Sequence, residues 1–359
     1  MEIKMYFIRA FLLLALLTQN LFAMNYDHKF SLNTKMTYIE SSTQQARSFG
    51  IIPAAILNVK ITDKFKFFSK ASILLETGSH KSALLDEFKP AQQVVLNHAY
   101  FDFNPWLLTH FNFGALPMKD WTPDILISST RFFGASFDQA IPLWAQAQLH
   151  LQGLSAIPSN QELTNRLGGV SEGTPNYWQA GLELDLPGDL LGIKAQGFIW
   201  GYDNINGNIA YQSGFMGNQT QGVGSTNSTL AYKFNGYSGS IDFEGIVEEW
   251  NWALGGDYIF NDGAPNERSQ GVKLRFLFGH SDYQSTLSWF DIQSDAAIGY
   301  YNNSLLGHTN RNGYAYQLEV KIDASSKIIF DYTHSTLIRQ NLVQSNQDAA
   351  SFNWSYQLN

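Results

Sequence analysis

The sequence has no cysteine among its 359 residues, and charged side chains make up only 15% of it. The absence of cysteine excludes disulfide scaffolds, Cys-ligated zinc or iron–sulfur sites and thiol catalysis. A charged fraction below the roughly 25% typical of soluble domains disfavours an ordinary cytoplasmic enzyme and, more strongly, intrinsic disorder. The formal net charge is -8, which argues against a nucleic-acid partner because phosphate binding requires a basic surface.

Long hydrophobic runs are also missing. Beyond the N-terminus, no stretch reaches the roughly 18 apolar residues that a membrane-spanning helix requires. A bundle of transmembrane helices is therefore excluded.

Residues 1–23 predict a secretory signal peptide. Lys4 and Arg9 precede an apolar run over 11–17, and a small residue ends the segment. This order of charge, apolar core and small residue is typical of export signals. A membrane anchor is the alternative, but the apolar run is short for a span and no stop-transfer segment follows it. We therefore expect an exported mature chain over 24–359.

Alternation of apolar and polar residues with period two dominates the exported part. In one segment, Leu149 and Leu151 alternate with Gln148, His150 and Gln152. Successive side chains of a strand point to opposite faces, so this pattern predicts strands with one apolar and one polar face. A soluble sandwich would alternate in the same way, so the connections between strands must decide.

About sixteen strands can be placed along the chain. They cover residues 28–40, 50–61, 65–77, 92–103, 109–116, 130–139, 145–153, 176–186, 192–202, 228–245, 248–261, 270–279, 283–297, 312–322, 326–338 and 350–358. Many have the roughly 9 to 11 residues that a tilted strand needs to cross a bilayer. An even number lets the first and last strands pair and close the sheet, which leaves no unpaired edge in lipid.

The connectors alternate between short and long. Segments 62–64, 187–189 and 323–325 have turn-forming residues, whereas 154–175 and 203–227 are long and polar. This arrangement is typical of outer-membrane barrels. We expect an all-β fold, a transmembrane antiparallel β-barrel of about 16 strands with short periplasmic turns and long extracellular loops. Its lumen is too wide for side chains to fill, so a water-filled channel is expected.

A local motif adds a family resemblance. The segment Asn97-His98-Ala99-Tyr100-Phe101-Asp102-Phe103, followed by Phe113-Gly114-Ala115-Leu116-Pro117, is similar to the "A-Y…G-x-x-P" hairpin of phosphate-selective and related porins. With the barrel pattern, the chain resembles a sixteen-stranded outer-membrane porin of Gram-negative bacteria. The resemblance implies contact with outer-membrane lipid and lipopolysaccharide, insertion by the barrel-assembly machinery, and a possible homotrimer.

The resemblance also implies that the loop after the fifth strand folds into the lumen and forms the pore constriction. Here that loop covers 117–129, and Lys119, Asp120 and Asp124 are the charges expected nearest the narrowest point, where their field acts on passing ions. A solvated rim is the alternative position. One lysine against two aspartates disfavours phosphate selectivity, because phosphate-selective members cluster Lys and Arg in the pore.

Strand parity predicts which polar side chains line the pore. A Lys or Arg on the lipid face near the midplane would cost about 2 to 4 kcal/mol, so charged positions are expected inside. The expected pore-lining residues are Gln146, Gln148, His150, Gln152, Glu183, Asp185, Lys194, Gln196, Lys273, Arg275, Glu319 and Lys321. Their mixed signs indicate a general hydrophilic pore, and the overall acidic excess favours cations.

These features predict a passive channel for small hydrophilic solutes or ions, with no cofactor, no metal and no enzymatic activity. One alternative is a plugless receptor or porin for a sugar or siderophore. It would use the loops 154–175 and 203–227, with Trp200, Tyr202 and Tyr211 stacking on a sugar ring.

A second alternative is a hydrolase at the barrel rim. The eight histidines are scattered and lack the HExxH spacing of a zinc protease. His80, with Ser79 and Asp86 in one expected external loop, is the best catalytic grouping the sequence offers. The sequence places these three residues near one another only along the chain.

Overall fold

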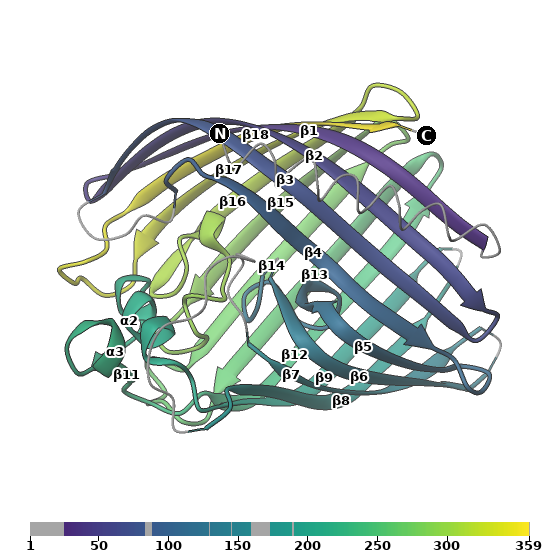
Figure 1. Ribbon diagram of the computed structural model, residues 1–359, viewed down its shortest axis with the longest axis horizontal. Coiled ribbons are helices and arrows are strands. Elements are labelled where there is room, and N and C mark those ends of the chain that lie inside the picture. Colours follow the sequence, from purple (N-terminus) through teal and green to yellow (C-terminus); the bar gives the residue numbers. More distant parts are fainter. Residues whose placement is uncertain are drawn as a thin grey trace, which may run out of the picture.

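The computed structural model describes residues 25–82, 88–128, 130–144, 146–158, 173–188 and 190–358. They form a closed barrel of sixteen antiparallel strands (Figure 1). The barrel strands are β1 (Asn25–Ser41), β2 (Gln44–Thr62), β3 (Phe65–Ser82), β4 (Gln92–Phe103), β5 (Thr109–Pro117), β6 (Arg131–Pro142), β7 (Gln148–Ile157), β8 (Asn176–Leu186), β9 (Gly192–Asp203), β12 (Asn235–Val247), β13 (Trp250–Asn261), β14 (Gln270–Gly279), β15 (Tyr283–Ile292), β16 (Arg311–Lys321), β17 (Ser326–Leu337) and β18 (Gln347–Leu358). The predicted fold class and strand number are confirmed. The signal peptide predicted over 1–23 lies outside the described residues.

The barrel closes because β1 pairs with both β2 and β18. The closing register joins Phe30 to Leu358 at one end and Ser41 to Gln347 at the other. With β1 paired on both sides, the sheet has no free edge whose backbone groups would be unsatisfied in lipid.

The outer face is apolar and exposed, as the alternation predicts. Leu254, Phe276 and Leu287 are register partners on three neighbouring strands, and their exposed fractions are 51%, 48% and 55%. On β14, Lys273 and Arg275 alternate with these apolar positions and project to the inner face, where they contact other strands and loops. An exposed apolar band around a closed sheet requires a lipid environment.

The connections divide into two sets, as predicted. One end of the barrel has the short turns 63–64, 104–108, 143–147, 187–191, 248–249, 280–282 and 322–325. The other end, which we name the loop end, has the connections 42–43, 83–91, 118–130, 158–175, 204–234, 262–269, 293–310 and 338–346. The connection between β1 and β2 is shorter than expected. The predicted strands left residues 41–49 as a connector, but β1 and β2 continue to pair up to Glu40 and Gln45, so only residues 42–43 connect them.

Two predicted strands were too long. The strand expected over 228–245 begins only at Asn235, and residues 229–230 instead form β11 in a separate two-stranded sheet with β10 (Thr220–Gln221). The strand expected over 283–297 ends at Ile292. In both cases the chain turns away from the barrel wall.

The predicted hairpin motif is confirmed as the β4–β5 pair. Tyr100 lies opposite Gly114, whose φ is 133°. A Cβ at Gly114 would lie 2.4 Å from the Ala99 carbonyl oxygen. Only glycine therefore fits this position without a shift of the backbone.

The helical segments belong to the loops. They are η1 (Met118–Asp120), α2 (Gly207–Phe215), α3 (Gly224–Asn227) and η2 (Ser304–Leu306). Figure 1 shows α2, α3 and β11 together at the loop end. Among the described residues, no helix is both long and apolar enough to cross a membrane.

Candidate functional site

The connection between β5 and β6, residues 118–130, folds into the barrel. Met118, Ile125 and Ile127 are fully buried and belong to one hydrophobic cluster with Trp200 of β9. The Gln179 amide of β8 donates a hydrogen bond of 3.0 Å to the Trp121 carbonyl oxygen. Apolar packing and backbone hydrogen bonds therefore hold this inward loop against the inner wall.

An ion pair fixes the tip of the inward loop on a distant strand. Asp124 accepts a hydrogen bond of 2.7 Å from the Lys273 ammonium of β14 and one of 3.0 Å from the Asn303 amide. Burial alone would raise the pKa of the Asp124 carboxyl, but Lys273 and Asn303 hold that pKa below its ordinary value. Because β14 is not a neighbour of β5 or β6 around the barrel, this contact reaches across the lumen.

A second connection, 293–310, also folds inward. The Asn302 amide donates to the Ile125 carbonyl oxygen at 2.8 Å, and the backbone N–H of Ser128 donates to the Tyr301 carbonyl oxygen at 2.8 Å. The two inward loops therefore hold each other. The second was missed by sequence reasoning, which assigned its start to a strand; the buried apolar run 296–298 was the available signal.

The connection that contains α2 is tied to the second inward loop. The Asn218 amide donates to the carbonyl oxygens of Ser294 and Ala297 at 2.7 and 2.8 Å, and its oxygen accepts from Gly299 N–H at 2.7 Å. Asn218 is 4% exposed. Three separate connections thus share one buried hydrogen-bonded core at the loop end of the lumen.

A cavity of about 430 Å³ opens beside the inward loop. Its lining residues come from β3 to β7 and from the loop itself: Phe68, Tyr100, Asp102, His110, Asn112, Leu116, Pro117, Asp120, Trp121, Asp138, His150 and Gln152. Carboxylates, imidazoles and amides occupy its wall beside aromatic rings. The cavity therefore offers a polar, solvent-accessible surface on the inner wall.

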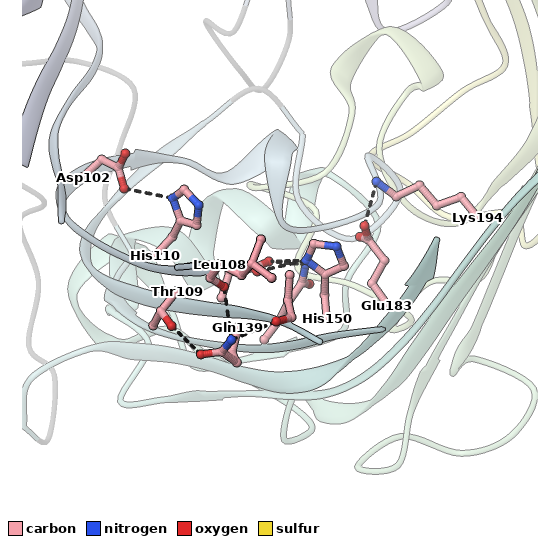
Figure 2. Close-up of polar contacts among 11 residues, drawn as sticks. Asp102, Leu108, Thr109, His110, Gln139, His150, Glu183 and Lys194 are labelled. Atoms are coloured by element: carbon pink, nitrogen blue, oxygen red, sulfur yellow. Dashed lines mark hydrogen bonds and ion pairs between the residues drawn. The ribbon is translucent and has the colours of Figure 1, made fainter. Parts of the chain in front are cut away.

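Two carboxylate–histidine pairs orient imidazoles on this wall. Nδ1 of His110 lies 3.2 Å from Asp102 Oδ1, and Nδ1 of His150 lies 2.9 Å from Asp138 Oδ1. The Gln152 amide also donates to Asp138 at 3.1 Å. Figure 2 shows His110 and His150 on the same stretch of inner wall, with their ring nitrogens turned to these partners. Among the described residues, no cluster of three or more His, Asp or Glu could hold a metal ion.

The three residues expected at the constriction occupy two different environments. Lys119 and Asp120 are exposed, and Asp120 lines the 430 Å³ cavity. Asp124 instead forms the ion pair with Lys273. The structure therefore makes Asp124 a tether of the loop, and a role of all three at the narrowest point stays a prediction.

Five of the charged residues predicted to line the pore form ion pairs: Glu183, Lys194, Lys273, Arg275 and Glu319. Lys194 lies 2.8 Å from Glu183 (Figure 2), and Lys327 lies 3.0 Å from Glu319. Arg275 joins two carboxylates, Asp242 at 2.6 Å and Asp257 at 2.5 Å. Most basic charge on this wall is therefore compensated locally.

The remaining predicted pore-lining residues are placed by register. His150 pairs with Glu183, and Gln196 pairs with Glu183 from the other side, so these three share the inner face. The inner face also has Gln148, Asp185 and Lys321 by the same alternation. Gln146 differs, because β7 begins only at Gln148 and Gln146 lies exposed in the short turn 143–147.

A group of inward lysines on β1, β3 and η1 was missed by sequence reasoning. Lys66 lies opposite Asp102 in the strand register, and Lys70 lies opposite His98, so both lysines are on the inner face with the cavity residues. Within the described parts of the chain, no ion pair joins a carboxylate to the inward lysines of this wall and loop: Lys29, Lys35, Lys66, Lys70 and Lys119. Lys70 and Lys119 are close enough to interact electrostatically. We name these five residues the lysine row.

Two of the three aromatic residues proposed for sugar stacking are buried. Trp200 is 0% exposed and Tyr202 is 8% exposed, because both pack in the lumenal core. Tyr211, on α2, is 36% exposed. The expected loop over 203–227 folds into α2, β10 and α3, and much of 154–175 lies outside the described residues.

The grouping proposed for a rim hydrolase is not formed as predicted. Ser79 and His80 lie on β3, not in an external loop. As neighbours on a strand, their side chains project to opposite faces of the barrel. Asp86 lies outside the described residues.

Comparison with known proteins places the fold in a class. The chain has the fold of sixteen-stranded porins. OprB from Pseudomonas putida, in a high-pH structure, superposes with a TM-score of 0.61 at 9% identity over 95% of this chain and 96% of that one. OmpF from Salmonella typhi, in complex with daunomycin, gives 0.50 at 10% identity over 93% and 97%. No family model and no curated protein sequence matches this chain.

Proposed function

We propose that the protein is an outer-membrane porin of a Gram-negative bacterium, forming a water-filled channel for the passive diffusion of small hydrophilic solutes or ions. The observation that carries the proposal is the division between the two faces of one closed sheet. The outer face is apolar and exposed, whereas the inner face has polar residues and the 430 Å³ cavity. A barrel of this size with a wet interior supports diffusion through the lumen.

The two inward loops would set the size limit of this channel. They share a hydrophobic core and hydrogen bonds with the wall, so the narrowing is built from packed segments. Packed, hydrogen-bonded segments open less readily than free loops. We therefore infer a permanently narrowed channel.

The distribution of charge in the lumen would determine whether the channel favours anions or cations. The basic residues of β8 to β17 are largely compensated by ion pairs, whereas the lysine row is not. The lysine row would give anions a path along β1, β3 and η1, next to carboxylates such as Asp120. The uncompensated lysines therefore favour anions, in contrast to the cation preference that the overall acidic composition indicated.

Planar-bilayer recording tests this function. Protein purified in detergent and folded is expected to give stepwise current increments, while the same preparation unfolded by heat gives none. Reversal potential in a KCl gradient then reads the sign preference of the lumen. Folded protein that inserts without any conductance would overturn the proposal.

A further inference from the structure

The 430 Å³ cavity beside the inward loop 118–130 has an acidic wall. Asp102 of β4, Asp138 of β6 and Asp120 at the end of η1 line it, and in the described part of the chain no lysine or arginine does. The lysine row lies on the same side of the barrel, but none of its members lines the cavity. A solute in the cavity would therefore meet three carboxylates and no ammonium or guanidinium group.

The two carboxylate–histidine pairs orient imidazoles as hydrogen-bond acceptors on this wall. An ionised carboxylate only accepts hydrogen bonds, so the hydrogen of each neutral ring lies on Nδ1, which faces Asp102 in His110 and Asp138 in His150. Nε2 of each ring is then an acceptor. Both rings line the cavity (Figure 2), and their side chains are 48% and 20% exposed, so a solute can reach them.

The remaining polar groups of the lining add to this excess of acceptors. The Asn112 amide nitrogen donates to Ser136 at 3.3 Å, and the Gln152 amide nitrogen donates to Asp138 at 3.1 Å. Asp120 is exposed, and among the described residues no hydrogen bond or ion pair engages its carboxylate. A ligand that complements such a wall carries several N–H donors and a positive charge.

Aromatic rings form another part of the lining. The Phe68 and Tyr100 rings stack with their centroids 5.4 Å apart, and Trp121 is half-buried next to Asp120 in the sequence. Aromatic faces attract cations and pack against carbon chains. A hydrated inorganic cation gains little from this surface, whereas an organic cation gains from both the acidic and the aromatic parts of the wall.

We propose that this cavity binds small organic cations that have a guanidinium or primary ammonium group. The charged group would donate hydrogen bonds to the carboxylates and to the imidazole Nε2 atoms, and its carbon chain would lie against Phe68 and Tyr100. The cavity volume lies within the roughly 300 to 1,000 Å³ of small-ligand sites. This inference rests on the proposed channel function, because it places a binding site on the path of solutes through the lumen.

Single-channel recording with matched probes tests the class of ligand. Butylguanidinium is added to the folded channel in KCl, and we expect interruptions of the open-channel current that become more frequent as its concentration rises. Tetramethylammonium has the same charge without N–H donors and should bind roughly tenfold more weakly. Butyrate, an anion with a similar carbon chain, should give no interruptions. Equal interruptions by butyrate, or none by butylguanidinium, would overturn the proposal.

Removing carboxylate charge from the cavity should weaken binding. Asp138→Asn should raise the dissociation constant of butylguanidinium roughly tenfold, and Asp120→Asn, at an exposed position, roughly two- to fivefold. Asp331→Asn is the matched control, because Asp331 lies on β17, bonds Gln317 and Ser351 and does not line the cavity. It should leave the constant unchanged. An unchanged constant in both cavity variants would contradict the site.

Saturation-transfer NMR of butylguanidinium with the folded protein in detergent separates binding from conduction. Binding that Asp138→Asn weakens, in a barrel that passes no current, would refute the proposed channel and keep the cation site. A conducting barrel to which butylguanidinium does not bind would refute the cation site and keep the channel.

Discussion

The ammonium of Lys273 lies 2.7 Å from Asp124 Oδ2, although the two residues are 149 positions apart in the sequence. The contact joins β14 to the inward loop 118–130. Lys273 is 14% exposed and Asp124 is 34% exposed at the side chain. A half-buried charged hydrogen bond of this kind can fix the position of a loop inside a wet lumen.

Replacing Lys273 with Met is expected to loosen the inward loop. Asp124 would keep only the Asn303 hydrogen bond, and the loss would cost about 1 to 2 kcal/mol after allowance for the partial exposure of Asp124. Open-channel current of single molecules should then show larger fluctuations than in the natural protein. Lys194→Met is the matched control, since Lys194 pairs with Glu183 on the barrel wall. Equal noise in the two variants would show that Lys273 does not hold the loop.

Acid is expected to release the same tether. The folded-state pKa of Asp124 is lower than its ordinary value, so its ion pair contributes fully above the unfolded pKa of about 4 and is lost as the pH falls through the lower folded value. Current fluctuations should therefore be unchanged between pH 7 and pH 5 and rise below about pH 4.

Asp124→Asn isolates this titration from that of other groups. In this variant the fluctuations should already be large at pH 7, and the rise on acidification should disappear. A rise of the same size in Asp124→Asn would assign the pH effect to a different residue.

The barrel could be predicted from the sequence because the alternation of apolar and polar residues is a local pattern within each strand. Leu254 and Lys273 face opposite ways through the alternation of their own strands, and no distant residue has to be known. The Tyr100–Gly114 hairpin was predicted from its resemblance to a porin motif, and the structure supplies the physical reason, because the close approach of the two strands requires glycine at position 114.

The interior of the barrel could not be predicted in this way. Residues 293–297 were assigned to a strand, but they turn inward, where Asn218 of a distant connection binds the carbonyl groups of Ser294 and Ala297. Trp200 was expected at the mouth and is buried for a similar reason. The resemblance predicted Asp124 at the constriction, which stays a prediction, and its partner Lys273 depends on contacts that no local pattern encodes.

Removing charge from the lysine row is expected to shift ion selectivity toward cations. In Lys70→Gln combined with Lys119→Gln, two adjacent inward charges are lost, so the field that attracts anions weakens. The reversal potential in a KCl gradient should move in the cation-selective direction. Lys81→Gln is the control, because Lys81 pairs with Gln45 and projects to the outer face at the loop end. An equal shift in the control would place the effective charge outside the lumen.

The assignment of an apolar outer face and a polar inner face predicts that an introduced arginine destabilises the barrel on one face and is tolerated on the other. Leu182 of β8 is 51% exposed on the outer face, whereas Gln196 of β9 lies on the inner face beside Glu183. An arginine at 182 would enter lipid near the middle of the strand and should destabilise the folded barrel by about 2 to 4 kcal/mol. An arginine at 196 can pair with Glu183 and should fold normally.

Urea unfolding in lipid vesicles, followed by tryptophan fluorescence, measures both variants under one condition. We expect Leu182→Arg to unfold at clearly lower urea and Gln196→Arg to match the natural protein within about 0.5 kcal/mol, the range of ordinary surface substitutions. If Gln196→Arg is the damaging variant and Leu182→Arg is tolerated, the apolar, lipid-facing side of the sheet is the one that contains Gln196. A lumen that conducts hydrophilic solutes is then no longer possible.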